Sequence, residues 1–205
     1  MIIPTLKLEQ SLWKKGYALV CGLDEVGRGC FAGPVVVGAV IFSRDCILPD
    51  GIADSKLLKP RQRRELELRI KNQAICWSVA EVSVATINKV GIGKATQVAF
   101  RKAIKLLSKR PDFILIDAFY IKHFNRKTQK AVKSGDTICA SISAASIIAK
   151  VYRDNLMKKL HWKYPQYGFS KHKGYGTRKH QEALRMYGLS RIHRRSFNLS
   201  KFISL

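Results

Sequence analysis

Residues 24–29 read Asp24-Glu25-Val26-Gly27-Arg28-Gly29 and lie between two apolar runs, Tyr17-Ala-Leu-Val-Cys-Gly-Leu23 and Val35-Val-Val-Gly-Ala-Val-Ile41. Both runs are rich in Val, Leu or Ile and are separated by Gly and Pro, which predicts neighbouring β-strands over 17–23 and 35–42. The second run hardly alternates, so we expect its strand to be buried on both faces. Acids at a strand end, beside a flexible backbone and a fixed cation, indicate a divalent metal set close to a phosphate.

The rest of the chain supplies further strands and helices around this pair. We expect strands over 75–84 and 113–117, and helices over 7–15, 60–72, 95–108, 140–160 and 177–187. Strands first, followed by alternating helices and strands, predict an α/β fold with a mixed central β-sheet flanked by helices. The 205 residues fit one domain, with a core over about 1–165 and a basic C-terminal loop and helix over about 166–205.

The chain is strongly basic. Lys and Arg total 38 against 14 Asp and Glu, which gives a formal net charge of +24 and a pI near 10.2. Hydrophobic residues make up 46% of the chain, enough for a folded core. This charge on a folded domain favours a polyanionic partner, with nucleic acid ahead of an anionic membrane surface. Charge alone also fits a ribosome-associated or an ordinary basic protein.

The cysteines and the N-terminus indicate the compartment. Five cysteines, an odd number with no C-x-x-C spacing, predict neither a zinc site nor a disulfide framework. The N-terminus lacks the pattern of a signal peptide, and no apolar run approaches the ~20 residues that a membrane span needs. We therefore expect a protein of the reducing cytoplasm that does not enter a membrane.

Two more acids are placed like the opening pair. Asp117 ends the apolar run that begins at residue 113, and Asp136 lies in a loop ahead of the long helix. Acids at the carboxyl ends of strands in an α/β sheet often converge on one crevice. Their hard oxygen atoms suit Mg²⁺ or Mn²⁺. A single Asp in a turn more often shapes the turn, so the argument depends on the four acids together.

The acid pair sets a geometric condition. Because neighbouring side chains of a strand point to opposite faces, Asp24 and Glu25 share a metal centre only if the strand ends, bends or bulges there. Gly27 and Gly29 make that feasible, and successive N–H groups of the turn around Arg28 are suited to an anion. An ordinary glycine turn has the same spacing, so the position directly after the acids is what favours binding.

Three further segments are candidates for substrate contact. Ser55 and Lys56 precede a helix and either hold a phosphate at its N-terminus or simply lead into it. Ser146 and Lys150 lie four residues apart on one helical face and bind either phosphate or solvent. Residues 167–177 interleave aromatic, basic and glycine residues, which is typical of a nucleic-acid contact loop and also of a packed Tyr-rich loop.

Two similarities to other sites fail. Gly91-Ile-Gly-Lys94 is close to a P-loop, but that pattern needs Gly at 88 and Ser or Thr at 95, where this chain has Asn88 and Ala95. The five histidines show no H-E-x-x-H or other zinc-ligand spacing. We therefore expect neither a binding site for a nucleoside triphosphate nor a zinc-dependent hydrolase.

Eight segments, in order along nearly the whole chain, carry a family resemblance: Gly22-Leu-Asp-Glu-Val-Gly-Arg-Gly29, Asp54-Ser-Lys56, Ile116-Asp117, Lys133-Ser-Gly-Asp136, Ala144-Ala-Ser-Ile-Ile-Ala-Lys-Val-Tyr-Arg-Asp154, Tyr167-Gly-Phe169, His172-Lys-Gly-Tyr175 and His193-Arg-Arg-Ser-Phe197. The chain resembles bacterial ribonuclease HII, the type 2 ribonuclease H. The resemblance implies a ribonuclease H-like fold. It also implies endonucleolytic cleavage of RNA in RNA–DNA hybrids and on the 5′ side of ribonucleotides embedded in duplex DNA. The products would carry 5′-phosphate and 3′-hydroxyl ends, and the role would be removal of misincorporated ribonucleotides and RNA primers.

The same resemblance implies roles for individual residues. The catalytic and metal-binding acids fall on Asp24, Glu25, Asp117 and Asp136, the recognition turn on Gly27, Arg28 and Gly29, and the junction-sensing tyrosine on Tyr175. Asp154 lies in a matching segment but is not one of the four acids, and we interpret it as structural. Two Mg²⁺ or Mn²⁺ ions would act together, with Asp24 bridging them, to activate a water and stabilise the leaving oxygen.

Two rival functions and one partner remain open. Ribonuclease HIII carries a sizeable N-terminal substrate-binding domain and lacks Gly-Arg-Gly after its acid pair, whereas this acid pair begins at residue 24 and Arg28 is present. A catalytically silent nucleic-acid-binding module would have lost an acid, and all four are here. The tail over 197–205 either docks on a replication clamp or packs on its own domain, and we favour the second. We expect a monomer.

Overall fold

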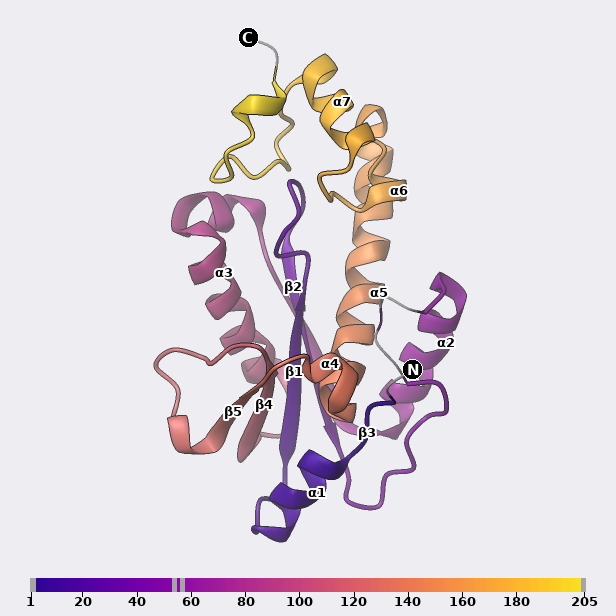
Figure 1. Ribbon diagram of the computed structural model, residues 1–205, viewed down its shortest axis with the longest axis vertical. Coiled ribbons are helices and arrows are strands. Elements are labelled where there is room, and N and C mark those ends of the chain that lie inside the picture. The colour runs from indigo at the N-terminus through magenta and orange to yellow at the C-terminus, as the bar shows by residue number, and fades with distance from the viewer. Residues whose placement is uncertain (1–2, 53–54, 56–57, 204–205) are drawn as a thin grey trace.

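The computed structural model describes residues 3–52, 55 and 58–203. A five-stranded sheet forms its centre, with strands in the order β3-β2-β1-β4-β5 (Figure 1). The strands are β1 (Val20–Val26), β2 (Val35–Phe42), β3 (Ala74–Val82), β4 (Phe113–Asp117) and β5 (Gln129–Val132). β2 runs antiparallel to both its neighbours, while β1, β4 and β5 are parallel to one another. The predicted α/β fold with a mixed sheet is confirmed.

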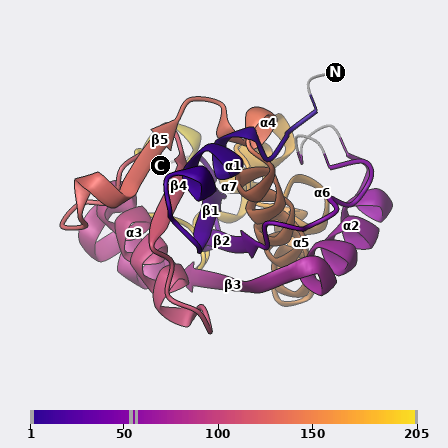
Figure 2. The same ribbon diagram turned by 90° about the horizontal axis from the view of Figure 1, so that it is seen from below.

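Helices cover both faces of this sheet. α5 (Ala140–Lys163), α2 (Pro60–Gln73) and α1 (Lys7–Lys14) pack on one face, and α3 (Val84–Leu106) packs on the other (Figures 1 and 2). The alternation of a strand divides β1 between the two cores: Val20 joins the α5 side, and Cys21 and Leu23 join the α3 side. β2 is buried at all 8 of its positions, as its unbroken apolar run predicts.

Two glycines let α5 lie close to the middle of the sheet. A Cβ on Gly22 would lie 2.2 Å from the carbonyl carbon of Ser141, and one on Gly38 would lie 2.2 Å from the carbonyl oxygen of Ala145. Atoms do not approach so closely, so any side chain at either glycine would push the helix off the sheet. The close packing brings the N-terminal part of α5, at Ser146, against β1.

Several predicted boundaries were wrong. β1 starts and ends three residues later than predicted, and its pairing with β2 continues as far as Val26. The predicted helix 95–108 is only the second half of α3, which begins after Ser83, whose Oγ accepts a hydrogen bond from the N–H of Thr86 at 3.2 Å. Gly91, with φ 77° and ψ 158°, interrupts α3 and hides its first half from a search for helical periodicity.

The stretch 118–133 contains a strand that the sequence did not predict. β5 has four residues, and only Gln129 and Val132 are buried, so it lacks the apolar run of the central strands. The 3₁₀ turn η1 (Arg126–Thr128) precedes it, and the short helix α4 (Gly135–Ile138) follows. Asp136 therefore lies in a helical turn and not in the loop expected for it.

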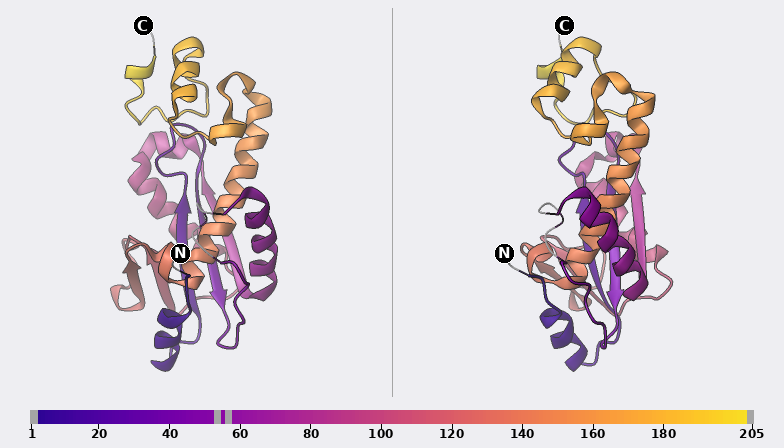
Figure 3. Two further views of the ribbon diagram at one scale, coloured as in Figure 1. Left: turned by 45° about the vertical axis from the view of Figure 1, so that its right-hand side comes forward. Right: turned by 90° about the vertical axis from the view of Figure 1, so that its right-hand side faces the viewer.

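The C-terminal elements gather beyond the end of α5 (Figure 3). They are η2 (Pro165–Tyr167), α6 (Phe169–His172), α7 (Arg178–Tyr187) and η3 (Ser200–Phe202), so part of the expected loop 167–177 is helical. Leu199 is buried in the tail, and the ring of Phe202 lies 5.3 Å from that of Phe31. As far as residue 203, the tail therefore packs on its own domain, while the boundary near residue 165 stays a prediction. Within the ranges described, no helix has the length and apolar character to cross a bilayer.

Candidate active site

Two of the predicted acids come from neighbouring parallel strands. The register places Leu23 of β1 beside Ile116 of β4. Asp24 and Asp117 are the next residues of each strand, so they lie at the same level at the carboxyl ends of the pair. This is the convergence that acids at strand ends of an α/β sheet are expected to show.

The third element of the site is α4. The backbone N–H of Gly135 donates to Oδ1 of Asp117 at 2.7 Å, which fixes the start of α4 against the end of β4. Asp136 follows directly and is buried. Asp117 and Asp136 both act electrostatically on Asp24. Acids from three elements thus meet at one end of the sheet.

Asp24 and Glu25 reach the site from opposite faces of β1. β1 pairs with β2 without interruption from Cys21 to Val26, so the strand neither ends nor bulges at the two acids. Asp24 faces α5, where Ser146 hydrogen-bonds to it. Glu25 faces the other way, and both side chains still line one cavity. The reason is that pairing with β4 stops at Leu23, which leaves that edge of β1 open.

The acids repel one another in a buried setting. Burial is the main cause that raises the pKa of Asp24 to about 7. The hydrogen bond from Ser146 opposes this, and the charges of Asp117 and Asp136 add to it. Burial, with the charge of Asp24, raises the pKa of Glu25 to about 8 against the lowering effect of Arg28. Ionising the whole cluster is therefore costly without a nearby cation.

The donor set fits a hard divalent cation. Oε2 of Glu25 is buried and accepts no hydrogen bond from the described part of the chain, which is unusual for a carboxylate oxygen. Carboxylate oxygens are what Mg²⁺ and Mn²⁺ prefer. Among the described residues, no group of three or more His, Cys, Asp or Glu side chains would hold an ion by itself. An open site of this kind suits Mg²⁺, which binds through one or two carboxylates and takes substrate phosphate and water as its other ligands.

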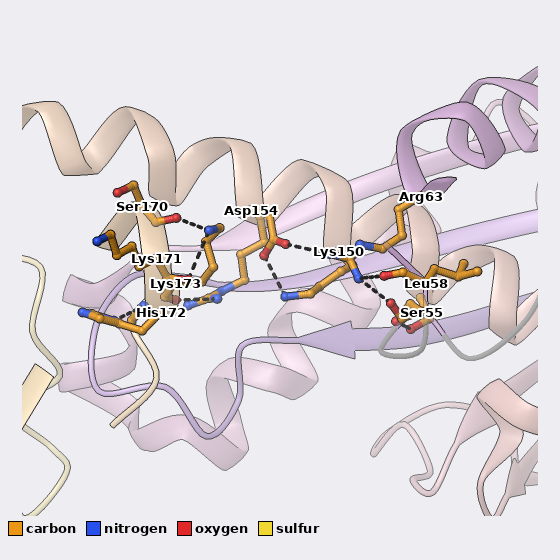
Figure 4. Close-up of polar contacts among 12 residues, drawn as sticks. Ser55, Leu58, Arg63, Lys150, Asp154, Ser170, Lys171, His172 and Lys173 are labelled. Atoms are coloured by element: carbon orange, nitrogen blue, oxygen red, sulfur yellow. Dashed lines mark hydrogen bonds and ion pairs between the residues drawn. The ribbon is translucent and has the colours of Figure 1, made fainter. Parts of the chain in front are cut away.

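Polar side chains of α5 and α2 form one wall of the cavity (Figure 4). The hydroxyls of Ser55 and Ser146 are 3.0 Å apart, which links the loop before α2 to the helix beside Asp24. Arg63 of α2 is nearly buried and donates from Nη1 to the carbonyl oxygen of Ser55 at 2.7 Å. Arg63 was not among the predicted site residues, although it lines the cavity.

Lys150 continues this wall. Its Nζ lies 2.8 Å from Oδ1 of Asp154, and Nη2 of Arg63 lies 3.6 Å from Oδ2 of the same carboxylate. Asp154 therefore balances two cations at the edge of the cavity, which agrees with its interpretation as a structural acid. Figure 4 shows the three side chains meeting between α5 and α2.

The Gly-Arg-Gly turn is held by a buried arginine. Arg194 has no exposed surface and donates to the carbonyl oxygens of Gly27 at 2.6 Å, Arg28 at 2.7 Å and Gly33 at 2.9 Å. Gly27 has φ 90°, a conformation that favours glycine. A Cβ on Gly29, by contrast, would meet no atom within 4 Å. Only the first glycine of the turn is thus required by the fold.

A second buried arginine supports the same loop from α5. Arg153 donates to the carbonyl oxygens of Pro34 at 3.0 Å, Ala32 at 3.1 Å and Lys173 at 2.9 Å. A Cβ on Gly27 would lie 2.0 Å from its Nε. The Gly-Arg-Gly turn is therefore held in place by two fully buried guanidinium groups.

Tyr175 lines the same cavity, near Lys150. The residue is 40% exposed, and the centroid of its ring lies 5.8 Å from Nζ of Lys150 and 5.8 Å from Cζ of Arg153. Its side chain is hydrogen-bonded with that of Cys30. A half-exposed aromatic ring beside cations is suited to stacking on a sugar or base.

One cavity of about 600 Å³ unites most of the predicted site residues. It is lined by Asp24, Glu25, Val26, Gly27, Arg28, Ser55, Arg63, Asp117, Ser146, Lys150 and Tyr175. Of the other predicted residues, Asp136 acts through its charge on Asp24, and Gly29 follows the lined part of the turn. Lys56 lies outside the described residues.

Comparison with known proteins agrees with this geometry. A family model described as ribonuclease HII matches residues 21–200. The chain belongs to the ribonuclease HII family. The ribonuclease HII of Chloroherpeton thalassium is 48% identical over 196 residues, which cover 94% of this chain and 95% of that protein. That of Chlamydia caviae is 46% identical over 190 residues, which cover 92% of this chain and 88% of the relative.

Solved structures share the ribonuclease HII fold. The crystal structure of ribonuclease H2 from Pyrococcus horikoshii superposes with a TM-score of 0.74 at 29% identity, covering 89% of this chain and 95% of that one. A ribonuclease HII from Archaeoglobus fulgidus, solved in complex with PCNA, has a TM-score of 0.71 at 24% identity and covers 86% of this chain and 94% of its own. A ribonuclease HIII solved in complex with Mn²⁺ has a TM-score of 0.66 at 19% identity, over 91% of this chain and 69% of that one. The last two show the fold alone.

Proposed function

We propose that the chain is an endoribonuclease that cleaves the RNA strand of RNA–DNA hybrids. We also propose that it cuts on the 5′ side of ribonucleotides embedded in duplex DNA. Membership of the ribonuclease HII family supports the substrate class. The observation that carries the proposal is the cavity in which Asp24, Glu25 and Asp117 adjoin the turn at Gly27 and Arg28. Carboxylates for a metal and backbone groups for a nucleic acid face the same space.

The four acids are the proposed ligands of two divalent ions, Mg²⁺ or Mn²⁺. When bound, such ions supply a hydroxide nucleophile at neutral pH and offset the charge that develops on the leaving 3′ oxygen. Asp24 would hold both ions, because it adjoins Glu25 on β1 and interacts electrostatically with Asp117 and Asp136. The hydroxyl of Ser146 and the N–H of Gly135 hold Asp24 and Asp117 in place.

Selection of ribose depends on the 2′-hydroxyl, the group that distinguishes RNA from DNA. We assign its recognition to backbone groups of residues 27–29. Arg194 and Arg153 support this assignment because they fix the turn before substrate arrives. A turn that does not have to reorganise can place the hydroxyl beside the carboxylates at little cost in conformational entropy.

The remaining wall of the cavity suits the phosphodiester that follows. Ser55, Ser146 and Lys150 offer hydroxyl and ammonium donors to phosphate oxygens. Lys56 is proposed to join them. Arg63 and Lys150 share one carboxylate, which leaves a net positive charge on this wall. Tyr175 is proposed to stack on the deoxyribose at the junction.

Cleavage of an end-labelled duplex with one ribonucleotide tests this function. With Mg²⁺ or Mn²⁺ we expect one cut on the 5′ side of the ribonucleotide, leaving 3′-hydroxyl and 5′-phosphate ends. An all-DNA duplex and the same reaction in EDTA serve as controls. A chain that binds the duplex but cuts it with neither metal would be the silent binding module.

The variant Tyr175→Ala is expected to lose junction cleavage while it keeps duplex binding. Stacking of this kind is worth about 1–3 kcal/mol, which predicts a loss of about 10- to 100-fold at a single ribonucleotide. Tyr175→Phe keeps the ring and is the matched control. The measurement is cleavage of a one-ribonucleotide duplex beside binding of the same duplex in EDTA. Equal losses in both assays would contradict the role given to Tyr175.

The remaining partners are also proposals. We propose that the protein acts as a monomer in the cytoplasm, and its five free cysteines fit a reducing compartment. A replication clamp is the alternative partner for the tail. Such docking would have to release Phe202 from its contact with Phe31. Packing on the chain's own domain is the simpler role for that segment.

A further inference from the structure

A second groove lies beside the catalytic cavity, between α3 and the loop after β4. It has a volume of about 570 Å³, and we call it the basic groove. Its cationic side chains are Arg28, Lys94, Arg101 and Lys122, with His123 beside them, and none of the described residues that line it is an acid. In the part of the chain that the structure describes, Lys94, Arg101 and Lys122 pair with no carboxylate. Unpaired cations that face a common hollow indicate an anionic ligand.

The walls of the basic groove are fixed to each other. Gln97 of α3 donates from Nε2 to the carbonyl oxygen of Tyr120 at 3.0 Å, and its Oε1 accepts from the N–H of Lys122 at 2.8 Å. Arg101 donates to the carbonyl oxygen of Lys122 at 3.4 Å. These bonds hold the loop after β4 against α3, so the groove exists before any ligand binds.

The basic groove is continuous with the catalytic cavity. Arg28 lines both, and its guanidinium lies 4.4 Å from the ring centroid of Phe119. Phe119 follows the acid Asp117 by two residues and lines the groove. A nucleic-acid strand with one phosphate at the carboxylates can therefore continue past Arg28 into the basic groove.

We propose that the basic groove binds the sugar-phosphate backbone of the substrate duplex beyond the reacting phosphate. This inference rests on the proposed function, because that function places the reacting phosphate in the cavity. Contacts with backbone phosphates release counterions and add affinity without reading sequence. Lys94 and Lys122 come from different walls and line the hollow together, so a strand lying in it meets cations on both sides.

Paired charge removals test the basic groove. The variant Lys94→Gln/Lys122→Gln is compared with Lys7→Gln/Lys14→Gln, which removes the same charge from α1 at the end of the sheet where β1 begins (Figure 1). Affinity for a one-ribonucleotide duplex is measured in EDTA over a range of salt concentrations. We expect the groove variant to bind about 10-fold more weakly or worse. We also expect its salt slope to fall by about 0.9 for each phosphate that the variant no longer neutralises, while the α1 variant changes little.

Truncated duplexes give the direction of the bound strand. One duplex is shortened on the 5′ side of the ribonucleotide and the other on its 3′ side. With the duplex that no longer reaches the basic groove, the groove variant and the parent chain should bind with equal affinity. If both double variants lost the same affinity, the effect would be one of net charge and the proposal would be overturned. The proposal would also be overturned if the groove variant bound both shortened duplexes more weakly than the parent chain does. Binding is read without metal, so a failure of the basic groove is distinct from a failure to cleave.

A second inference rests on three histidines of the C-terminal segment. His180 and His193 have no exposed surface, and the ring of His172 stacks on that of His180 with centroids 4.4 Å apart. Burial lowers the pKa of His180 to about 4 and that of His193 to about 3, so both rings are neutral near pH 7. A neutral imidazole has one donor and one acceptor.

The tautomers of His193 and His180 follow from the backbone N–H of Ser190, which can only donate a hydrogen bond. The N–H of Ser190 donates to Nδ1 of His193 at 2.9 Å, so His193 carries its proton on Nε2. That atom lies 3.0 Å from Nε2 of His180, which must accept. His180 therefore carries its proton on Nδ1, which donates to the carbonyl oxygen of Tyr175 at 2.9 Å.

The third ring holds the residue before Tyr175. The N–H of Gly174 donates to Nδ1 of His172 at 3.2 Å, so the proton of His172 is on Nε2. That nitrogen donates to the carbonyl oxygen of Tyr167 at 2.6 Å. Imidazoles thus hold the Gly174 N–H and the Tyr175 carbonyl, on both sides of the tyrosine.

We infer that His193 and His180 form a directional relay that positions Tyr175 at the catalytic cavity, and that His172, stacked on His180, holds the preceding Gly174. His180 is a positioning residue in this relay, because it acts on the substrate through Tyr175. The inference rests on the proposed stacking role of that ring. The relay works in one proton arrangement only. In the reverse arrangement Nδ1 of His193 would carry a proton and face the N–H of Ser190, so two donors would meet.

Two amide substitutions test the two ring nitrogens of His180 separately. In His180→Asn the side-chain amide takes the place of Nδ1–H and keeps the donation to Tyr175. In His180→Gln the amide lies at the place of Nε2, and that donation is lost. The readout is cleavage at a single ribonucleotide relative to cleavage of a long RNA–DNA hybrid. We expect the Asn variant to keep the parent ratio and the Gln variant to lose about 10-fold or more, as stacking is lost.

Nitrogen-15 NMR of the parent chain supplies a readout that is independent of activity. We expect His180 to be protonated on Nδ1, and His172 and His193 on Nε2. A proton on Nε2 of His180 would overturn the relay, and so would equal losses of the ratio in His180→Asn and His180→Gln. If neither variant folds, the tautomers of the parent chain still decide between the two outcomes.

Discussion

The variant Asp24→Asn is expected to lose cleavage by about 1,000-fold or more, because metal ions contribute several kcal/mol to the transition state. The same variant is expected to melt at a higher temperature than the parent chain in EDTA at pH 8. Asp24 has a folded pKa of about 7, above its unfolded value near 4, mainly because it is buried. The native state thus binds more protons than the unfolded state between these values, so its stability falls as pH rises through about 7. The amide removes the charge and keeps the shape, which gains on the order of 4 kcal/mol for a shift of this size.

Thermal melts at pH 4 and pH 8, with and without Mg²⁺, check this opposition between activity and stability. The gain from Asp24→Asn should be large at pH 8 and small at pH 4. Mg²⁺ should raise the melting temperature of the parent chain much more than that of the variant, since a ligand of the native state stabilises it. Asp45→Asn, at an exposed acid, is the control. Retained Mg²⁺-dependent cleavage, or a lower melting temperature in EDTA, would remove Asp24 from the proposed centre.

Much of the site was predictable because its residues follow from local sequence. Asp24 and Asp117 each end an apolar run, and runs of that kind become neighbouring central strands whose ends meet. Ser146 and Lys150 were placed on one helical face by their spacing, and α5 presents both to the cavity. These inferences needed only strand and helix periodicity, which the burial of β2 on both faces also satisfied.

The way in which Glu25 enters the site was not predictable. The alternation of a strand excludes a shared face for residues 24 and 25, so the sequence required the strand to end, bend or bulge there for both acids to reach one centre. The structure instead keeps β1 intact and ends β4 early, at Asp117. A strand's length relative to its neighbour is set by tertiary packing, which one sequence does not reveal.

The buried arginines were also missed as supports. Arg153 continues the stripe formed by Ala149 and Met157 at spacings of four residues, so its place on a buried helical face was predictable. An arginine on an apolar stripe indicates a buried guanidinium with several acceptors. For Arg194 no periodicity gives such a signal, because it lies outside any helix or strand.

The variant Arg194→Lys is expected to destabilise the protein by about 3 kcal/mol or more. The guanidinium donates to three carbonyl oxygens, of Gly27, Arg28 and Gly33, and an ammonium cannot reach all three in this geometry. Each buried carbonyl left without a donor costs about 1–3 kcal/mol. For a chain of this size, such a destabilisation lowers the melting temperature by roughly 6–12 °C. Differential scanning calorimetry measures it.

The same change should weaken discrimination between ribose and deoxyribose, because the turn that carries Gly27 and Arg28 loses its support. Arg195→Lys is the matched control, because Arg195 follows Arg194 in the chain, is exposed and should tolerate the exchange. Cleavage of a one-ribonucleotide duplex is compared with cleavage of the all-DNA duplex at a temperature where both variants are folded. If Arg194→Lys melts like Arg195→Lys, the carbonyls of the turn do not need the guanidinium. If it melts early but still rejects DNA as the parent chain does, the turn keeps its shape without Arg194, and ribose selection must come from elsewhere in the cavity.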